Sequence, residues 1–165
     1  MLLRKIAFAG AILSMIGVAP GFGQTTVNAN LAVQITITAA CQINSAAPLN
    51  FGSNGVLANN VDVDTTVVVQ CTNNTPFNIG LGPGAGTGAT LANRLMTATS
   101  GATIGYSLYT TAGRTTVWGN TSTTNWQPGT GTGAPQTFTV HGRVPAQTTP
   151  AAGTYTDTVA VTLTY

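Results

Sequence analysis

Strict alternation of apolar and polar positions is the clearest pattern in the chain, and it begins at Leu31. The apolar positions are Leu31, Val33, Ile35 and Ile37, and the positions between them are Ala32, Gln34, Thr36 and Thr38. A period of two over this length predicts a half-buried β-strand. Val27 and Ala29 continue the same parity toward the N-terminus.

Further short runs of branched and aromatic residues, separated by turn residues, predict more strands. They are Leu49–Phe51, Val61–Gln70, Phe77–Leu81, Tyr106–Tyr109, Thr115–Trp118, Thr137–Val144 and Tyr155–Tyr165. In the last of these, the C-terminal strand, the apolar set is Val159, Val161, Leu163 and Tyr165. Loops rich in Gly, Thr and Pro join the runs, and no linker divides them. Many short strands with frequent turns predict an antiparallel β-sandwich with Greek-key connections.

The composition agrees with an all-β chain of one domain. The 165 residues are 43% hydrophobic and only 5% charged, and threonine is the commonest residue. Branched side chains suit a pleated surface and lose rotamer freedom in a helix, so a mostly helical domain is excluded.

Residues 1–23 have the features of a secretory signal peptide. Arg4 and Lys5 precede the apolar run Ile6–Val18, and small residues follow, with cleavage expected after Gly23. The apolar run is too short to span a bilayer but suits the core of a signal peptide. A buried N-terminal helix is the alternative interpretation. Export through the periplasm to the cell surface or the medium is therefore expected.

Removal of the leader leaves a chain with no formal net charge. The remaining bases are Arg94, Arg114 and Arg143, and the acids are Asp62, Asp64 and Asp157. No basic cluster indicates a nucleic acid or an anionic membrane as partner. A chain near zero net charge also has little to oppose self-association.

Two cysteines, Cys41 and Cys71, remain after cleavage. An even pair in an exported chain predicts a disulfide. A free thiol nucleophile or metal ligand is the competing interpretation.

Groups capable of catalysis are scarce. The chain has no Glu and one His. The Asp62–Asp64 pair is interpreted as a polar strand edge or turn rather than as catalytic carboxylates. His141, Asp157 and a serine could form a catalytic triad, but the sequence has no nucleophile motif to support one. The glycine-rich run 84–89 lacks the helix and the acidic residue of a dinucleotide site. Trp118, Trp126 and Tyr106 are expected to pack the fold rather than bind sugar. No catalytic residue, cofactor, metal site or small-molecule substrate is predicted.

Five segments in order resemble the spore coat protein U domain family, to which subunits of archaic chaperone–usher pili belong. They are Leu49–Gly52, Arg94–Met96 with Gly105–Tyr109, Val117–Gly119, Val140–Pro145 and Gly153–Tyr165. The resemblance covers nearly all of the chain after the leader. His141 departs from it, because the family more often has an aromatic residue there.

The resemblance implies an incomplete immunoglobulin-like sandwich whose missing strand comes from another subunit. The donor segment would be residues 24–36, with Val27, Ala29, Leu31, Val33 and Ile35 as its buried side chains, and residues 37–165 would form the pilin domain. Identical or related pilin subunits, a periplasmic chaperone and an outer-membrane usher are the implied partners. The implied product is a surface fibre for adhesion and biofilm formation.

Two other functions remain open at this point. The N-terminal strand could fold into its own domain, giving a self-complemented coat or matrix protein. A carbohydrate-binding tip adhesin is the other alternative, although the chain offers no room for a separate receptor-binding domain. The sequence does not indicate which face of the sandwich would receive a donor strand.

Overall fold

The computed structural model describes residues 21–121 and 124–165. The predicted leader falls mostly outside these residues. Contacts divide the chain between Ile35 and Thr36, and Thr36–Tyr165 forms one compact unit. Residues 21–121 and 124–165 contain no helix with the length and apolar character needed to cross a membrane.

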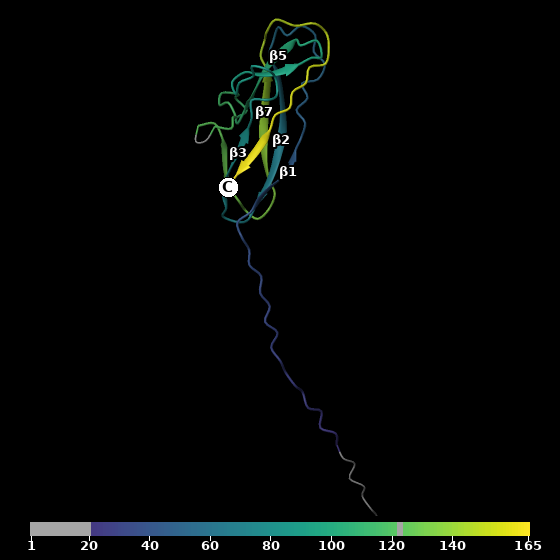
Figure 1. Cartoon of the computed structure of the whole chain (residues 1–165), viewed down its shortest axis with the longest axis vertical. Coiled ribbons are helices and arrows are strands. Elements are labelled where there is room, and N and C mark those ends of the chain that lie inside the picture. Colours follow the sequence, from purple (N-terminus) through teal and green to yellow (C-terminus); the bar gives the residue numbers. More distant parts are fainter. Residues whose placement is uncertain (1–20, 122–123) are drawn as a thin grey trace, which may run out of the picture. The chain divides into compact units, whose positions relative to one another are not determined.

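The described residues form two antiparallel sheets (Figure 1). The strands are β1 (Cys41–Ala46), β2 (Val61–Cys71), β3 (Pro76–Leu81), β4 (Arg94–Thr97), β5 (Thr103–Tyr109), β6 (Gln127–Thr130), β7 (Gln136–Val144) and β8 (Val161–Thr164). The five-stranded sheet has the order β1-β2-β7-β5-β4, and the three-stranded sheet has the order β6-β3-β8. The predicted antiparallel sandwich is therefore confirmed.

The longest ladder joins β2 to β7 and sets the inward face of the larger sheet. Val67 lies opposite Phe138, and Thr65 lies opposite Val140. Val67, Val69 and Val140 are each at most 3% exposed. Because side chains alternate across a strand, this register sends the intervening threonines to the outer face.

The core lies between the sheets and is centred on Trp118, which is fully buried. Its indole Nε1 donates to the Ile79 carbonyl at 2.8 Å, which satisfies the one polar atom of the ring. Phe77, Ile79 and Leu81 of β3 surround the same core. The alternation in these strands is thus the signature of a face packed against a second sheet.

Arg94 is the exception in this core, since its side chain is completely buried. Nε donates to the Gly82 carbonyl at 2.8 Å, Nη1 to that of Leu91 at 2.9 Å, and Nη2 to those of Leu81 and Trp118 at 2.9 and 2.7 Å. Burial lowers the pKa of the guanidinium, but arginine still keeps its charge. Arg94 therefore ties β4 to the end of β3 through backbone oxygens.

Several strand predictions differ from the structure. Leu49–Phe51 is not a strand, and Thr115–Trp118 contributes only a single bridge between Val117 and Tyr109. The strands β1, β4 and β6 are not among those that the sequence pattern predicts, and the C-terminal ladder is confined to β8. Residues 21–40 form no ladder, because a strand exists only where a neighbouring chain supplies hydrogen-bond partners.

Candidate functional site

The four edges of the two sheets are not equivalent. At the β4 edge, Thr97 forms a bridge with Thr156, and the edge strand β6 contains Pro128, which has no N–H to offer. Covering an edge or placing proline on it prevents addition of another strand. In the described part of the chain, β1 and β8 have no partner on their outer sides. These two edges are therefore the ones open to strand addition.

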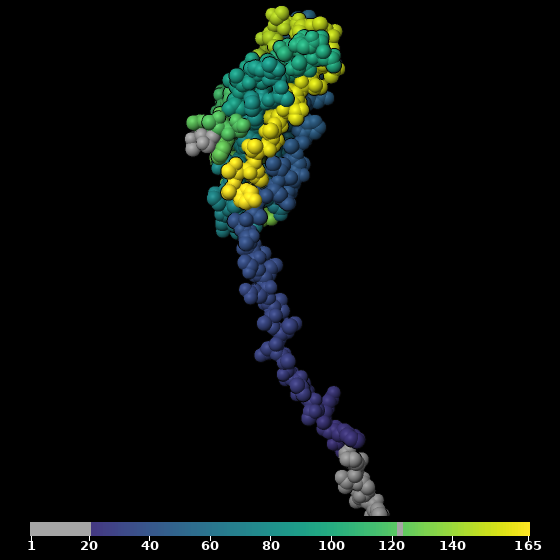
Figure 2. Space-filling model, in the orientation of Figure 1, coloured from purple at the N-terminus to yellow at the C-terminus, as the bar shows by residue number. Residues whose placement is uncertain are grey.

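The open edges lie beside each other, although they belong to different sheets. β1 and β8 contact one another. In the space-filling view the C-terminal segment, in yellow, and residues near β1, in blue, run along the same face of the domain (Figure 2). We call the boundary between them the seam.

Apolar side chains along the seam are only partly covered. Val159, Val161 and Leu163 of the C-terminal segment pack against the core but remain half-buried. Ile43 on β1 is 39% exposed and Tyr165 is 61% exposed. Apolar surface of this kind is stabilised when a partner covers it. The seam is thus a part of the core whose apolar side chains remain partly exposed to solvent.

A cavity of about 760 Å³ lies between the segment that follows β1 and the segment that leads to β8. Its apolar lining comes from Leu49, Phe51, Leu57, Val61, Met96, Ile104, Val144 and Tyr155. Loops 50–55 and 149–154 form its rim. The cavity is larger than one side chain needs, so this part of the sandwich has room for additional apolar groups.

The N-terminal segment has the complementary property. Val27 is 92% exposed, Leu31 87%, Val33 86% and Ile35 82%. Ala29, the fifth predicted donor residue, is also exposed. A regular apolar row exposed to water is unfavourable by about 1.5–3 kcal/mol for each large side chain, relative to full burial. The segment therefore lacks the apolar partner that its pattern requires.

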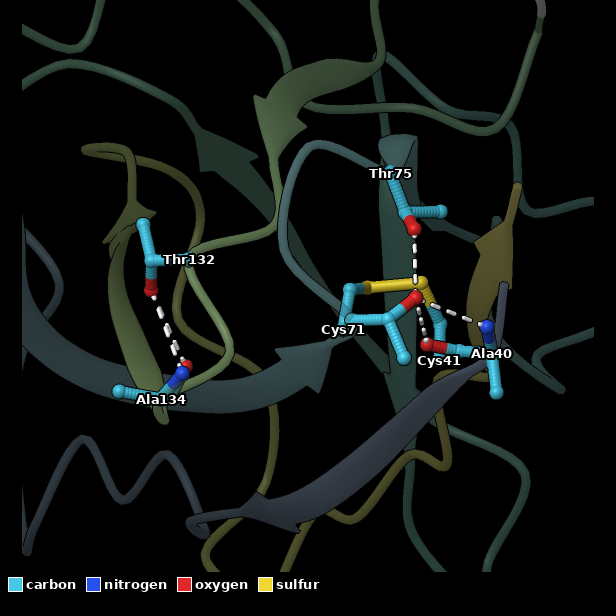
Figure 3. Close-up of a disulfide and its surroundings, with 7 residues drawn as sticks. Ala40, Cys41, Cys71, Thr75, Thr132 and Ala134 are labelled. Carbon is cyan, nitrogen blue, oxygen red and sulfur yellow. Dashed lines mark hydrogen bonds between the residues drawn. A yellow bond between two sulfur atoms is a disulfide. The ribbon is translucent and has the colours of Figure 1, made fainter. Parts of the chain in front are cut away.

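The start of β1 is fixed by a disulfide. Cys41 and Cys71 are bonded, as the sequence predicts, and join the first residue of β1 to the last residue of β2 (Figure 3). Beside them, the Ala40 N–H donates to Thr72 Oγ1 at 3.1 Å, and the Thr72 N–H donates to the Ala40 carbonyl at 2.9 Å. The N-terminal segment therefore leaves the domain from a rigid point at the edge strand.

Most of the charged side chains pair on the outer face of the larger sheet. Arg143 binds both oxygens of Asp62 at 2.7 Å, and Arg114 Nη2 lies 2.6 Å from Asp64 Oδ1. His141 Nδ1 lies 2.9 Å from the same Asp64 oxygen. The Asp62–Asp64 pair is thus bound by arginines across the sheet, which gives it a structural role.

Asp157 lies elsewhere and holds the C-terminal segment. It accepts hydrogen bonds from Tyr106 Oη at 2.6 Å and from the N–H groups of Ala85 and Thr158 at 2.7 Å. Burial, together with the Asp157 hydrogen bond, raises the pKa of the Tyr106 phenol. His141 contacts Asp64 rather than Asp157, so the imagined triad is not assembled. No signal in the sequence indicated this tyrosine–aspartate contact.

The Asp62–Arg143 pair should make stability depend on acid. The hydrogen bond from Arg143, and then the charge of Arg114, hold the pKa of Asp62 below its usual value. A depressed folded-state pKa contributes stability above the unfolded value of about 3.9, and that stability disappears as pH falls through the folded value. We expect Asp62→Asn to reduce the acid dependence of the urea midpoint modestly, because the pair is partly exposed. Arg143→Gln should have the same effect, and the double variant should add little; additive effects would contradict the pairing.

The fold defines the chain as an all-β antiparallel sandwich protein with two sheet edges, β1 and β8, that are unpaired among the described residues. The family model described as the Spore Coat Protein U domain matches residues 27–162, and the chain belongs to this family. The match includes most of the exposed N-terminal segment. The family is structural, so the chain is not an enzyme.

Two further comparisons agree with this placement. The chain is 35% identical to "Protein U" of Myxococcus xanthus over an alignment of 174 positions, which includes 97% of this chain and 96% of the relative. It also resembles a chain in the crystal structure of the CsuC–CsuE chaperone–tip adhesion subunit pre-assembly complex from archaic chaperone–usher Csu pili of Acinetobacter baumannii. That likeness has a TM-score of 0.57 at 24% identity, and it covers 79% of this chain but only 40% of the other, so it concerns the fold.

Proposed function

We propose that this chain is a structural subunit that polymerises head to tail, with residues 24–36 of one copy filling the seam of the next. The observation that carries the proposal is the combination of an exposed apolar row, Val27 to Ile35, with two open edges at β1 and β8. Strand addition to an exposed edge is a common mode of recognition, in which main-chain bonds give affinity and alternate side chains give specificity.

The dimensions of donor and seam support the pairing. Residues 27–35, which carry the five apolar donor positions, span about 30 Å as an extended strand, and the C-terminal segment 155–165 is long enough to run beside them. Burial of Leu31, Val33 and Ile35 contributes about 1.5–3 kcal/mol each, and each ladder hydrogen bond adds about 1 kcal/mol. The gross gain is about 10–20 kcal/mol, and the net gain is smaller, because ordering the segment and joining two molecules both cost entropy.

The positions of the chain ends favour a donor that runs antiparallel to β8. The start of β1 and the C-terminus lie at the same end of the domain (Figure 1). An antiparallel donor would bring Ile35 to the other end, near the cavity, and its own domain would stack beyond loops 50–55 and 149–154. The acceptor's own N-terminal segment would then remain free for the next copy. Such a contact is heterologous and propagates as a fibre.

Export and assembly follow from the same proposal. A subunit with an open seam exposes apolar surface that would aggregate in transit, so a periplasmic chaperone would cover it until an outer-membrane usher exchanges it for a donor segment. The fold likeness to the Csu chaperone–subunit complex supports these partners. The resulting fibre would lie on the cell surface and serve adhesion and biofilm formation.

Deletion of residues 24–35 tests the proposal. The leaderless full chain should form ladders on size-exclusion chromatography and fibres in electron micrographs, whereas the deleted chain should give neither. Addition of the full chain to the deleted chain should produce short oligomers that end in a deleted copy, since its seam remains intact. Normal fibres from the deleted chain alone would refute strand donation.

A self-complemented coat protein is the second candidate, and the description of the family as a spore coat domain supports it. In that case the leaderless chain would be a stable monomer, and limited proteolysis would leave residues 24–36 uncut. A subunit that donates its strand would show the opposite behaviour: the segment would be cut in the monomer and protected in the polymer.

A further inference from the structure

Loop 50–55 at the rim of the cavity contains a reactive sequence that the assembly function does not use. Asn54 is followed by Gly55, and no other asparagine in the chain precedes a glycine. Both residues are exposed, and the next residue, Val56, is 82% exposed. The loop is therefore open to water on the side where these residues lie.

The local geometry leaves the backbone of Gly55 free to move. Among the described residues, the Gly55 N–H donates no hydrogen bond, and no heavy atom lies within 4 Å of the position that a Cβ would take. The Asn54 side chain is held through Nδ2, which donates to the Phe51 carbonyl at 2.8 Å and to the Gly52 carbonyl at 3.5 Å. An exposed bond of this kind exchanges readily with water. The amide carbon and the following backbone nitrogen can thus approach each other.

We propose that Asn54 is a self-modifying site at which the chain converts an amide into a carboxylate. The Gly55 backbone nitrogen attacks Asn54 Cγ and forms a five-membered succinimide. The Gly55 proton goes to the departing nitrogen, and the side-chain amide leaves as ammonia. Water then adds to either ring carbonyl and breaks one C–N bond. The products are aspartate, or isoaspartate in which the backbone passes through the side chain, with no oxidant or cofactor consumed.

Either product changes the rim of the cavity. The Nδ2 donor to Phe51 disappears, and a negative charge appears beside a lining that includes Leu49, Phe51 and Leu57. None of the described residues that line this cavity is basic, so the new charge has no partner. An unpaired carboxylate next to apolar surface opposes burial of that surface. If the proposed strand donation is correct, conversion would weaken the seam as the protein ages.

Mass spectrometry of the leaderless full chain tests the modification directly. After incubation in mildly alkaline buffer, the peptide that contains Asn54 should gain the mass of an amide-to-acid conversion and become a substrate for isoaspartyl methyltransferase. Asn78, followed by Ile79 within β3, is the internal control and should stay unchanged. Gly55→Ala, for which the structure has room, and Asn54→Gln should each slow the conversion severalfold. An unmodified Asn54, or equal conversion in these variants, would overturn the proposal.

The consequence for assembly has a separate readout. The Asn54→Asp full chain should polymerise severalfold more slowly than the parent chain, and Asn54→Gln should polymerise normally. If no variant polymerises, the proposed function fails while the mass measurement still decides the modification. If all variants polymerise equally, the modification has no regulatory effect on the seam, and that part of the proposal is wrong.

Discussion

Leu31→Asp is expected to abolish polymerisation without unfolding the subunit. Leu31 lies at the centre of the apolar row and is 87% exposed in the single chain, so the substitution removes no contact of the folded domain. In the proposed polymer the aspartate would enter an apolar seam without a basic partner. Burial of an unpaired carboxylate costs several kcal/mol, which is enough to reverse a large part of the gain from the remaining donor residues.

The matched control is Gln34→Asp, which adds the same charge to the opposite face of the same segment. That face would point to solvent in the polymer, so this variant should still form fibres. Thermal unfolding of the two monomers should coincide with that of the parent, and electron microscopy with size-exclusion chromatography should separate them. Equal loss of fibres in both variants would indicate a simple effect of charge, and fibres in both would refute the seam as the acceptor.

The elements that the sequence predicts best are strands that have another strand on each side. In β2, β3 and β7 the apolar positions recur with a period of two, because one face of each strand packs against the other sheet. The missed strands have no such signal: β1 reads CQINSA, and β6 contains proline and glycine. Their positions are set by ladders to β2 and β3, which a linear pattern does not reveal.

The candidate site divides in the same way. The apolar row of the N-terminal segment is visible in the sequence, since Val27 to Ile35 carry the strongest alternation in the chain, and its role as a donor stays a prediction. Its alternation predicted a strand, yet the single chain forms none there, which is consistent with a partner in another molecule. The seam could not be predicted, because it depends on which sheet edges are covered. Which edges are covered is determined by the bridge between Thr97 and Thr156 and by the order of the strands, and neither can be read from a linear sequence.

The buried polar residues were also beyond prediction. In the sequence Arg94 is one of three bases that balance three acids, whereas in the structure its guanidinium donates to four backbone carbonyls, those of Leu81, Gly82, Leu91 and Trp118. Nothing in the residues around position 94 distinguishes such an arginine from an exposed one. Whether the arginine is buried depends on the conformation of the loops around it, and that conformation depends on the packing of the whole domain.

Removal of the disulfide, as Cys41→Ala with Cys71→Ala, is expected to lower the free energy of unfolding by about 3–4 kcal/mol, because the bond closes a loop of 30 residues. A loss of this size is a large part of the stability of a small domain. The measurement is the denaturant midpoint of the variant, compared with the parent chain in its oxidised and reduced forms. A parent whose midpoint does not change on reduction would contradict the expectation.

The position of the bond predicts where the loss will be felt first. β1 has a ladder on one side only, so the start of this edge is held mainly by that ladder to β2, the Ala40–Thr72 hydrogen bonds and the Cys41–Cys71 bond. Amide hydrogen exchange should therefore rise more in β1 than in β2 or β7 when the bond is absent. Because β1 forms one wall of the seam, the variant without the disulfide should also bind a donor strand more weakly than the parent, even under conditions in which most of the variant is folded. Uniform loss of protection across all three strands would instead assign the disulfide a purely global role.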